Sequence, residues 1–333
     1  MKSPITSKEM SLMKERRTLD FRKESFEVIF HYYLCQDSKE QFTNTVIDEI
    51  NIQQVYNQYR DRLNIPFPEE IAFIREQYGL SAVKMSEILG LGINSYRQYE
   101  AGEIPTTANA KLILMASDPY TFIEMIKLCG TLDASIKEKY LQKAQLILNE
   151  KNKNYSQRIL KEYLLGDHLA DIFSGYRNPN LEKFTEMTVY FSEKLEPFKT
   201  KMNKLLFYAD FLMFKQSCFS ISGLRYKAIE RGPVPNNYQS IFEYLDNTNQ
   251  IDIVSTEFTN GIIGEQFKAK KDRPFNASLF SVIEIEVLEK VSTFFQHKST
   301  SETIDISHLE KAWQYNHENK QIISYNYAFE IDL

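Results

Sequence analysis

Asp305, Ser307 and His308 lie close together in the sequence and carry the three functional groups of a hydrolytic triad. Such triads are assembled from residues that are distant in sequence, with the nucleophile on a strained turn. The chain also lacks a G-x-S-x-G elbow, a Walker loop, an H-E-x-x-H motif and a dinucleotide fingerprint. We therefore expect no enzyme activity and no catalytic residue, and we interpret His308 as a hydrogen-bonded packing residue.

Two amide side chains, Asn94 and Gln98, have the chemistry to read DNA bases. Asn and Gln can each bond adenine bidentately at N6 and N7 in the major groove. On a helix, with about 100° per residue, both lie on the face opposite Tyr96. The predicted DNA-binding residues are these two amides and the flanking side chains that can hold phosphates, which are Ser95, Arg97 and Tyr99.

The elements that would position this face are predicted between residues 68 and 101. Ile71 and Tyr78 share one face of a first helix, which Gly79 ends, and Ser81 can cap a second helix. A Gly-Leu-Gly turn leads into a third helix, and short helices around a glycine turn are typical of a helix-turn-helix. The alternative is a helical bundle without a DNA role. Because acidic side chains outnumber basic ones over residues 66–130, we expect DNA binding to be modest, salt-sensitive and carried out by a homodimer.

A second candidate site is the stretch "SGLRYKAIERGPVPNNYQSI", Ser222–Ile241. Gly232 permits a sharp backbone path, and Pro233 and Pro235 fix their φ angles, so a loop here loses little entropy on binding. Tyr and Arg are also enriched at interface hot spots. The alternative is that the stretch only connects a strand to a helix, with Tyr226 and Trp313 in the core. The predicted partner-binding platform consists of Tyr226, Arg231, Gly232, Pro233 and Tyr238.

Composition limits the class of protein. With 333 residues and 43% hydrophobic content, the chain can form more than one core. Its net charge of -5 argues against a nonspecific nucleic-acid binder. The most apolar run, "LLFYADFLMF", is interrupted by Asp210 and is too short for a membrane span. The N-terminus lacks the apolar segment of a secretion signal, and three dispersed cysteines form no disulfide framework. We expect a cytoplasmic protein with no membrane partner.

The pattern of elements predicts a mainly α fold with small antiparallel β-sheets, an α+β class. Residues 16–35 are rich in aromatic and β-branched side chains and predict a hairpin broken near Lys23. Two further strands are predicted at 250–258 and 264–272. Most of the remaining sequence has helical periodicity.

The stretch "LSAVKMSEILGLGINSYRQYEAGEIPT", residues 80–106, resembles the Cro/repressor-type or XRE helix-turn-helix. The first 130 residues look similar to the MqsA family of antitoxins, in which a zinc module with two Cys-x-x-Cys pairs precedes a helix-turn-helix. Here the four matching positions are Ser3, Thr6, Cys35 and Ser38. A structural zinc site needs four Cys or His ligands, so the metal does not carry over and we expect no cofactor. We interpret Cys35 as a buried thiol.

Residues 199–327 resemble the Panacea domain of toxin-neutralising, SocA-like antitoxins. The resemblance rests on the order and spacing of "KLLFYADF", "SGLRYKAIERGPVPNNY" and "SHLEKAW". It implies an antitoxin that binds and silences a cognate protein toxin, and many toxins of that family resemble alarmone synthetases. The platform residues are then the predicted toxin-binding residues, and operator-DNA binding with autorepression is a second expectation. The alternative is a helix-turn-helix transcriptional regulator with a C-terminal sensing or interaction domain.

These resemblances divide the chain into four predicted domains. They are a degenerate MqsA-like module without its metal ligands at 1–64, an XRE-type helix-turn-helix at 65–130, a helical connector at 131–180 and a Panacea antitoxin domain at 181–333.

Overall fold

The computed structural model describes residues 1–153, 155–257 and 263–333. The described chain divides into compact units, one formed by Met1–Val55 with Lys161–Leu333 and the other by Tyr56–Leu160. Helices α1 (Thr45–Leu63) and α8 (Tyr155–Leu165) carry the chain from one unit to the other. Helices dominate and the sheets are small and antiparallel, so the predicted fold class is confirmed.

The first unit begins with a long antiparallel hairpin. Strands β1 (Ser11–Phe21) and β2 (Glu24–Leu34) pair along their whole length, and β3 (Gln41–Phe42) adds a short third strand. Arg22 and Lys23 form the tight turn with positive φ angles of 48° and 68°. The hairpin and its turn are therefore as predicted, although β1 starts earlier than residue 16.

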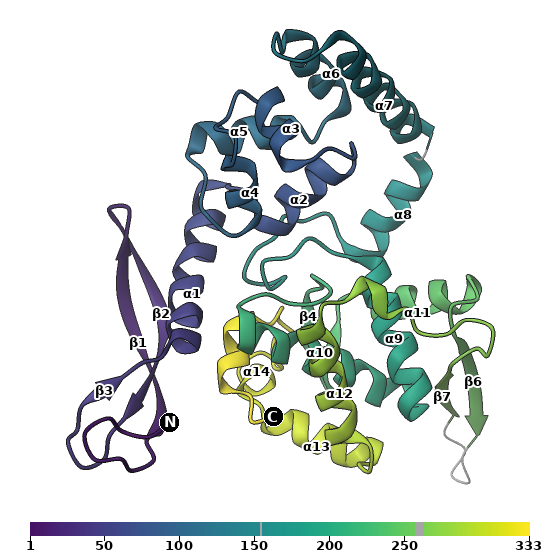
Figure 1. The fold of residues 1–333 in the computed structure, drawn as a ribbon. Coiled ribbons are helices and arrows are strands. Elements are labelled where there is room, and N and C mark those ends of the chain that lie inside the picture. Colours follow the sequence, from purple (N-terminus) through teal and green to yellow (C-terminus); the bar gives the residue numbers. More distant parts are fainter. Residues whose placement is uncertain (154, 258–262) are drawn as a thin grey trace. The chain divides into compact units, whose positions relative to one another are not determined.

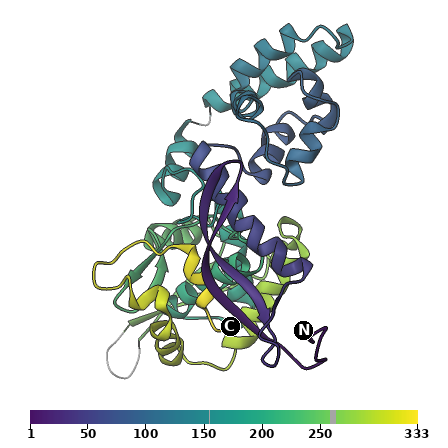
Figure 2. The ribbon, with the colours of Figure 1, turned by 90° about the vertical axis from the view of Figure 1, so that its left-hand side faces the viewer.

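Amide side chains from α1 hold this hairpin. Asn51 Oδ1 accepts from the backbone N–H of His31 at 2.8 Å, and its Nδ2 donates to the His31 carbonyl at 2.9 Å. Gln54 makes the same paired contacts with Ile29, both at 2.9 Å. These side chains pair with the backbone N–H and C=O groups of β2 in the way that a neighbouring strand would. Figure 2 shows α1 crossing the twisted hairpin.

The second unit is a helical bundle, visible in Figure 1. Its core is formed by side chains such as Ile71, Tyr96 and Ile113, all fully buried, and Tyr78 stacks on Phe122 with ring centroids 4.0 Å apart. The helices are α2 (Pro68–Glu76), α3 (Ala82–Ile88), α4 (Ser95–Glu100), α5 (Thr107–Met115), α6 (Pro119–Leu128) and α7 (Ala134–Lys153).

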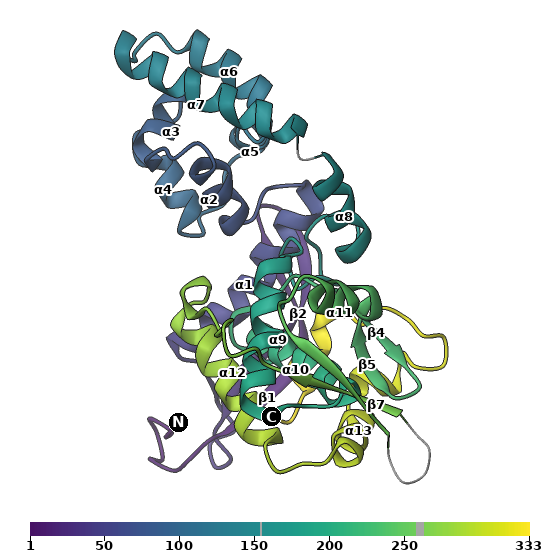
Figure 3. The same cartoon turned by 90° about the vertical axis from the view of Figure 1, so that its right-hand side faces the viewer.

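The C-terminal part of the first unit is built around helix α10 (Lys199–Ser217). Every residue of α10 from Lys201 to Phe214 is buried, as expected for a helix enclosed on all sides. It packs against α9 (Leu181–Leu195) and α12 (Val282–Phe295), as Figure 3 shows. The other elements here are β4 (Tyr226–Ile229), β5 (Gly232–Pro235), α11 (Tyr238–Asn247), β6 (Asp252–Glu257), β7 (Ile263–Lys268), η1 (Ala277–Leu279), α13 (Thr300–Leu309), α14 (Lys311–Gln314) and η2 (Tyr325–Glu330).

Strands β6 and β7 correspond to the two strands predicted in this region. Phe258, the last residue of the first predicted strand, lies outside the described residues. Over the ranges that the structure covers, no helix has both the length and the apolarity to cross a membrane.

Candidate functional site

A buried carboxylate fixes the chain between α10 and β4. Asp210 of α10 is fully buried and accepts hydrogen bonds from the backbone N–H groups of Ile221 and Ser222, both at 2.8 Å. It also accepts from the hydroxyls of Ser222 and Tyr226, the latter at 2.7 Å. Burial raises the pKa of Asp210, and these hydrogen bonds oppose that rise. The residue that interrupts the apolar run in the sequence therefore anchors the start of the candidate platform.

The Gly-Pro-Val-Pro segment is a strand rather than the loop that the sequence suggested. Strand β5 pairs with β4 in the register Ala228↔Pro233, with Glu230 and Arg231 at the turn. Proline has no N–H for a second neighbour, so its place is an edge strand such as β5, whose described strand partner is β4. Gly232 has a φ of 96°, and a Cβ there would lie 2.4 Å from Ser307 Oγ. Only glycine fits this position without displacement.

The structure separates the five predicted platform residues into two groups. Tyr226, Gly232 and Pro233 are buried, and Tyr226 has no exposed surface. Arg231 is exposed and Tyr238 is half-buried. Arg231 and Tyr238 can therefore contact a partner at the surface. The other three residues are part of the hairpin's buried framework.

Trp313 secures the end of β4. Its indole Nε1 donates to the Ile229 carbonyl at 2.7 Å. The imidazole of His308 stacks on one side with centroids 3.8 Å apart, and that of His317 stacks at 4.1 Å. His308 is half-buried and packs on Trp313, as interpreted from the sequence, but its Nε2 has no hydrogen-bond partner among the described residues.

A cavity of about 500 Å³ opens beside the turn, and its lining includes Arg231 and Tyr238 together with Asn203 and Lys204 of α10. Lys204 has no exposed surface, and its Nζ donates to the Pro233 carbonyl at 3.1 Å. Burial lowers the pKa of Lys204 to about 7, and the nearby charge of Arg231 adds to the effect. Sequence reasoning missed both α10 residues. The available signal was a lysine at the head of an apolar run.

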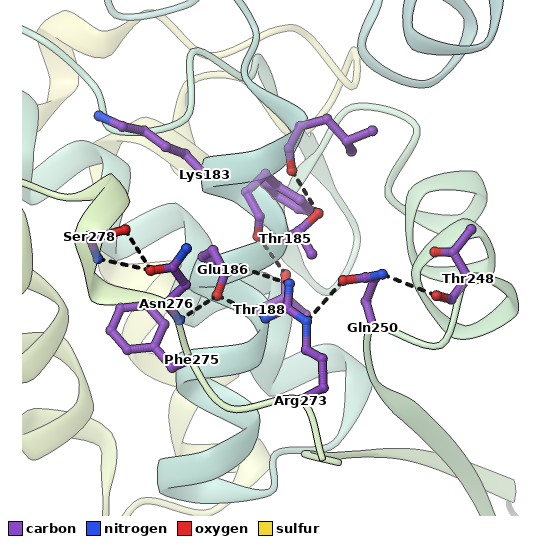
Figure 4. Close-up of polar contacts among 12 residues, drawn as sticks. Lys183, Thr185, Glu186, Thr188, Thr248, Gln250, Arg273, Phe275, Asn276 and Ser278 are labelled. Carbon is purple, nitrogen blue, oxygen red and sulfur yellow. Dashed lines mark hydrogen bonds and ion pairs between the residues drawn. The ribbon is translucent and has the colours of Figure 1, made fainter. Parts of the chain in front are cut away.

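A second buried charge holds the segment after β7 against α9 (Figure 4). Arg273 Nη1 and Nη2 donate to the two carboxylate oxygens of Glu186 at 2.9 and 2.6 Å, and the Asn276 N–H donates to the same carboxylate at 2.8 Å. Arg273 Nε reaches the side chain of Gln250 at 2.9 Å. A bidentate arginine–carboxylate pair of this kind fixes geometry, so we assign it a structural role.

In the second unit, α3 and α4 correspond to the second and third helices predicted on either side of the Gly-Leu-Gly turn. Ser81 caps α3 by accepting from the Lys84 N–H at 3.3 Å. The buried Tyr96 hydroxyl donates to the Ile71 carbonyl at 2.8 Å, and its backbone N–H donates to Ser86 Oγ at 3.1 Å. These contacts fix α4 on α2 and α3.

The predicted DNA-binding residues fall into two groups. Asn94, Arg97 and Gln98 are exposed, and Ser95 is half-buried. Tyr99 instead points into the core, where its hydroxyl accepts from Asn109 Nδ2 at 2.9 Å. The structure thus brings four of the five to the surface and leaves Tyr99 as a packing residue.

The four positions that correspond to a zinc module converge in space. The hydroxyls of Ser3, Ser38 and Thr6 hydrogen-bond Cys35 and lower the pKa of its thiol to about 6. Thr6 Oγ1 lies 3.5 Å from the Cys35 sulfur, and Cys35 is only 2% exposed. Within the described ranges, no group of three His, Cys, Asp or Glu side chains is placed to hold a metal ion.

In a comparison with known families, residues 202–314 match the model of a family described as "Antitoxin SocA-like, Panacea domain". The match covers about a third of the chain, from α10 through the hairpin and β6–β7 to α14. Comparisons with curated proteins and with solved structures found no match. The Panacea domain predicted from the sequence is confirmed over the matched residues, and the resemblances of the first 130 residues stay predictions.

Proposed function

We propose that this protein is an antitoxin that neutralises a protein toxin by binding it directly. The observation that carries the proposal is the match of residues 202–314 to the SocA-like antitoxin family. The matched segment contains the β4–β5 hairpin, and we place the toxin contact at its turn, with Arg231 and Tyr238 as the contacting side chains.

The hairpin is suited to this role because it is held rigidly from several sides. Trp313 bonds the Ile229 carbonyl at the end of β4, and the close fit of Gly232 fixes the start of β5. A contact group on such a support loses little conformational entropy when a partner binds. Among the described residues, Arg231 makes no hydrogen bond or ion pair, so its guanidinium is available for a carboxylate or a backbone carbonyl of the toxin.

Growth rescue tests the proposal. The product of the neighbouring gene is expressed as the candidate toxin, alone and together with this protein. The proposal predicts arrested growth in the first case and restored growth in the second. A helix-turn-helix regulator with a sensing domain would change transcription of its target genes without restoring growth when both proteins are made from unrelated promoters.

We further propose operator binding by α4, with autorepression of the protein's own gene. The supporting observation is that Asn94, Arg97 and Gln98 share an exposed surface on a helix anchored by the buried Tyr96. Amide side chains in this position can read adenine, and Arg97 can contact phosphate. The acidic balance of residues 66–130 makes the expected affinity modest and strongly dependent on salt.

A further inference from the structure

The cavity beside the hairpin turn is lined by two cationic groups, Lys204 and Arg231, that keep hydrogen-bond donors available. Among the described residues, Lys204 Nζ makes one hydrogen bond, to the Pro233 carbonyl. An ammonium group has three N–H donors, so donors remain for another acceptor. Arg231 lines the same cavity and is likewise without a bonded partner among the described residues.

No carboxylate in the described chain balances these two cations. Glu265 also lines the cavity, but it pairs with Lys199. The charge of Arg231 lowers the pKa of Lys204 beyond the effect of burial. Burial lowers the pKa of His308, and the charge of Lys204 lowers it further. A buried ammonium without a counter-charge is unfavourable. An anion in the cavity would supply the missing charge and acceptors.

An unpartnered amide points to the same conclusion. Asn203 is 2% exposed and lines the cavity, and its Oδ1 receives no hydrogen bond from any described residue. Buried polar atoms in native proteins are nearly always paired, and leaving one unpaired is unfavourable. A ligand hydroxyl or amine near the anionic group would donate to this oxygen.

We propose that the cavity binds a small organic phosphate, with its phosphoryl group between Lys204 and Arg231. A phosphoryl dianion matches two cations in charge, and it has enough oxygens for both the free ammonium donors and the guanidinium fork. A hydroxyl or amine of the ligand donates to Asn203, and its body packs on Tyr238 and Val234. The cavity volume of about 500 Å³ suits a ligand of this size. This site does not depend on the antitoxin proposal.

Calorimetric titration of the full-length protein with phenyl phosphate tests the proposal, with benzoate as the matched carboxylate. We expect phenyl phosphate to bind one per chain, more tightly than benzoate. At pH 8, where His308 is neutral and Lys204 is mostly uncharged, binding should also take up protons, because the anion favours the charged ammonium. Titrations in two buffers of different ionisation heat measure this uptake.

Three variants assign the binding to the cavity. Lys204→Met should weaken binding by about thirtyfold or more and abolish proton uptake. Arg231→Gln, at an exposed position that does not endanger folding, should weaken binding by about tenfold or more. Lys201→Met is the control, since Lys201 is also buried in α10 but bonds the Phe295 and Lys298 carbonyls outside the cavity lining. Absence of binding at millimolar phenyl phosphate, tighter binding of benzoate, or unchanged binding by Arg231→Gln would each overturn the proposal.

Discussion

The Tyr226 hydroxyl donates a 2.7 Å hydrogen bond to Oδ2 of Asp210, and both side chains have no exposed surface. This bond joins the central helix α10 to β4. The turn that carries Arg231 follows β4 directly, so the position of the proposed toxin contact depends on a polar contact in the core.

Removing this hydroxyl should destabilise the fold. Tyr226→Phe leaves Asp210 with one hydrogen-bond donor fewer in a buried site, and we expect a loss of about 1–3 kcal/mol in the free energy of unfolding. Tyr315→Phe is the matched control, because Tyr315 is 67% exposed. Urea denaturation followed by circular dichroism measures both. Equal stability of the two variants would show that the Asp210 bond does not hold the hairpin.

Lys204 should make stability depend on pH in the alkaline range. Its folded pKa is about 7, against 10.5 for an ordinary lysine, so between these values the unfolded chain binds more protons than the folded one. The free energy of unfolding should therefore rise with pH from about 7 to about 10.5. Below pH 7, the cost of burying the charged Lys204 ammonium is fully present. Lys204→Met should be more stable than wild type at pH 7, with the difference shrinking towards pH 10. A difference that is constant over this range would contradict the lowered pKa.

The operator proposal predicts separate losses for the two amides. Asn94→Ala and Gln98→Ala should each weaken binding to the DNA upstream of the protein's own gene by about 1–3 kcal/mol. Toxin neutralisation should survive both changes, and Arg231→Glu should bind this DNA as wild type does. Fluorescence anisotropy at several salt concentrations provides the measurement. If mutants and wild type bind every sequence equally and weakly, α4 is only part of the scaffold.

The converged hydroxyls around Cys35 predict the metal content. The purified protein should contain no stoichiometric zinc, and a chelator should leave its Tm unchanged, since a single thiolate does not hold structural zinc. The triple variant Ser3→Cys, Thr6→Cys and Ser38→Cys should restore four thiolates, bind one zinc per chain and gain Tm on zinc addition. Metal analysis under reducing conditions tests both. One tightly bound zinc in wild type, or none in the triple variant, would contradict the geometry.

Local patterns predicted much of this structure. The aromatic and β-branched side chains of residues 16–35 indicated the β1–β2 hairpin, and Tyr96, set on the helix face opposite Asn94 and Gln98, is buried while both amides are exposed. These assignments rest on local composition and periodicity, which the sequence displays directly.

Features that depend on distant neighbours were harder to predict. Proline and glycine favoured a loop at 232–235. An edge strand tolerates both residues, and β5 is an edge strand that pairs with β4. The burial of Lys204 depends on elements that pack on every side of α10, so the lysine at the head of the apolar run did not by itself predict the cavity. Tyr99 was assigned to the surface, and its place in the core depends on Asn109 of the following helix.

The dissociation constant of the toxin complex tests the central claim most directly. Purified wild type, Arg231→Glu and the matched control Arg97→Glu, which changes another exposed arginine, are titrated with the product of the neighbouring gene. Our account predicts a stoichiometric complex for wild type and Arg97→Glu, and binding weaker by about tenfold or more for a correctly folded Arg231→Glu. No complex with wild type would contradict the antitoxin proposal itself. Equal binding by all three would place the toxin contact away from the hairpin turn.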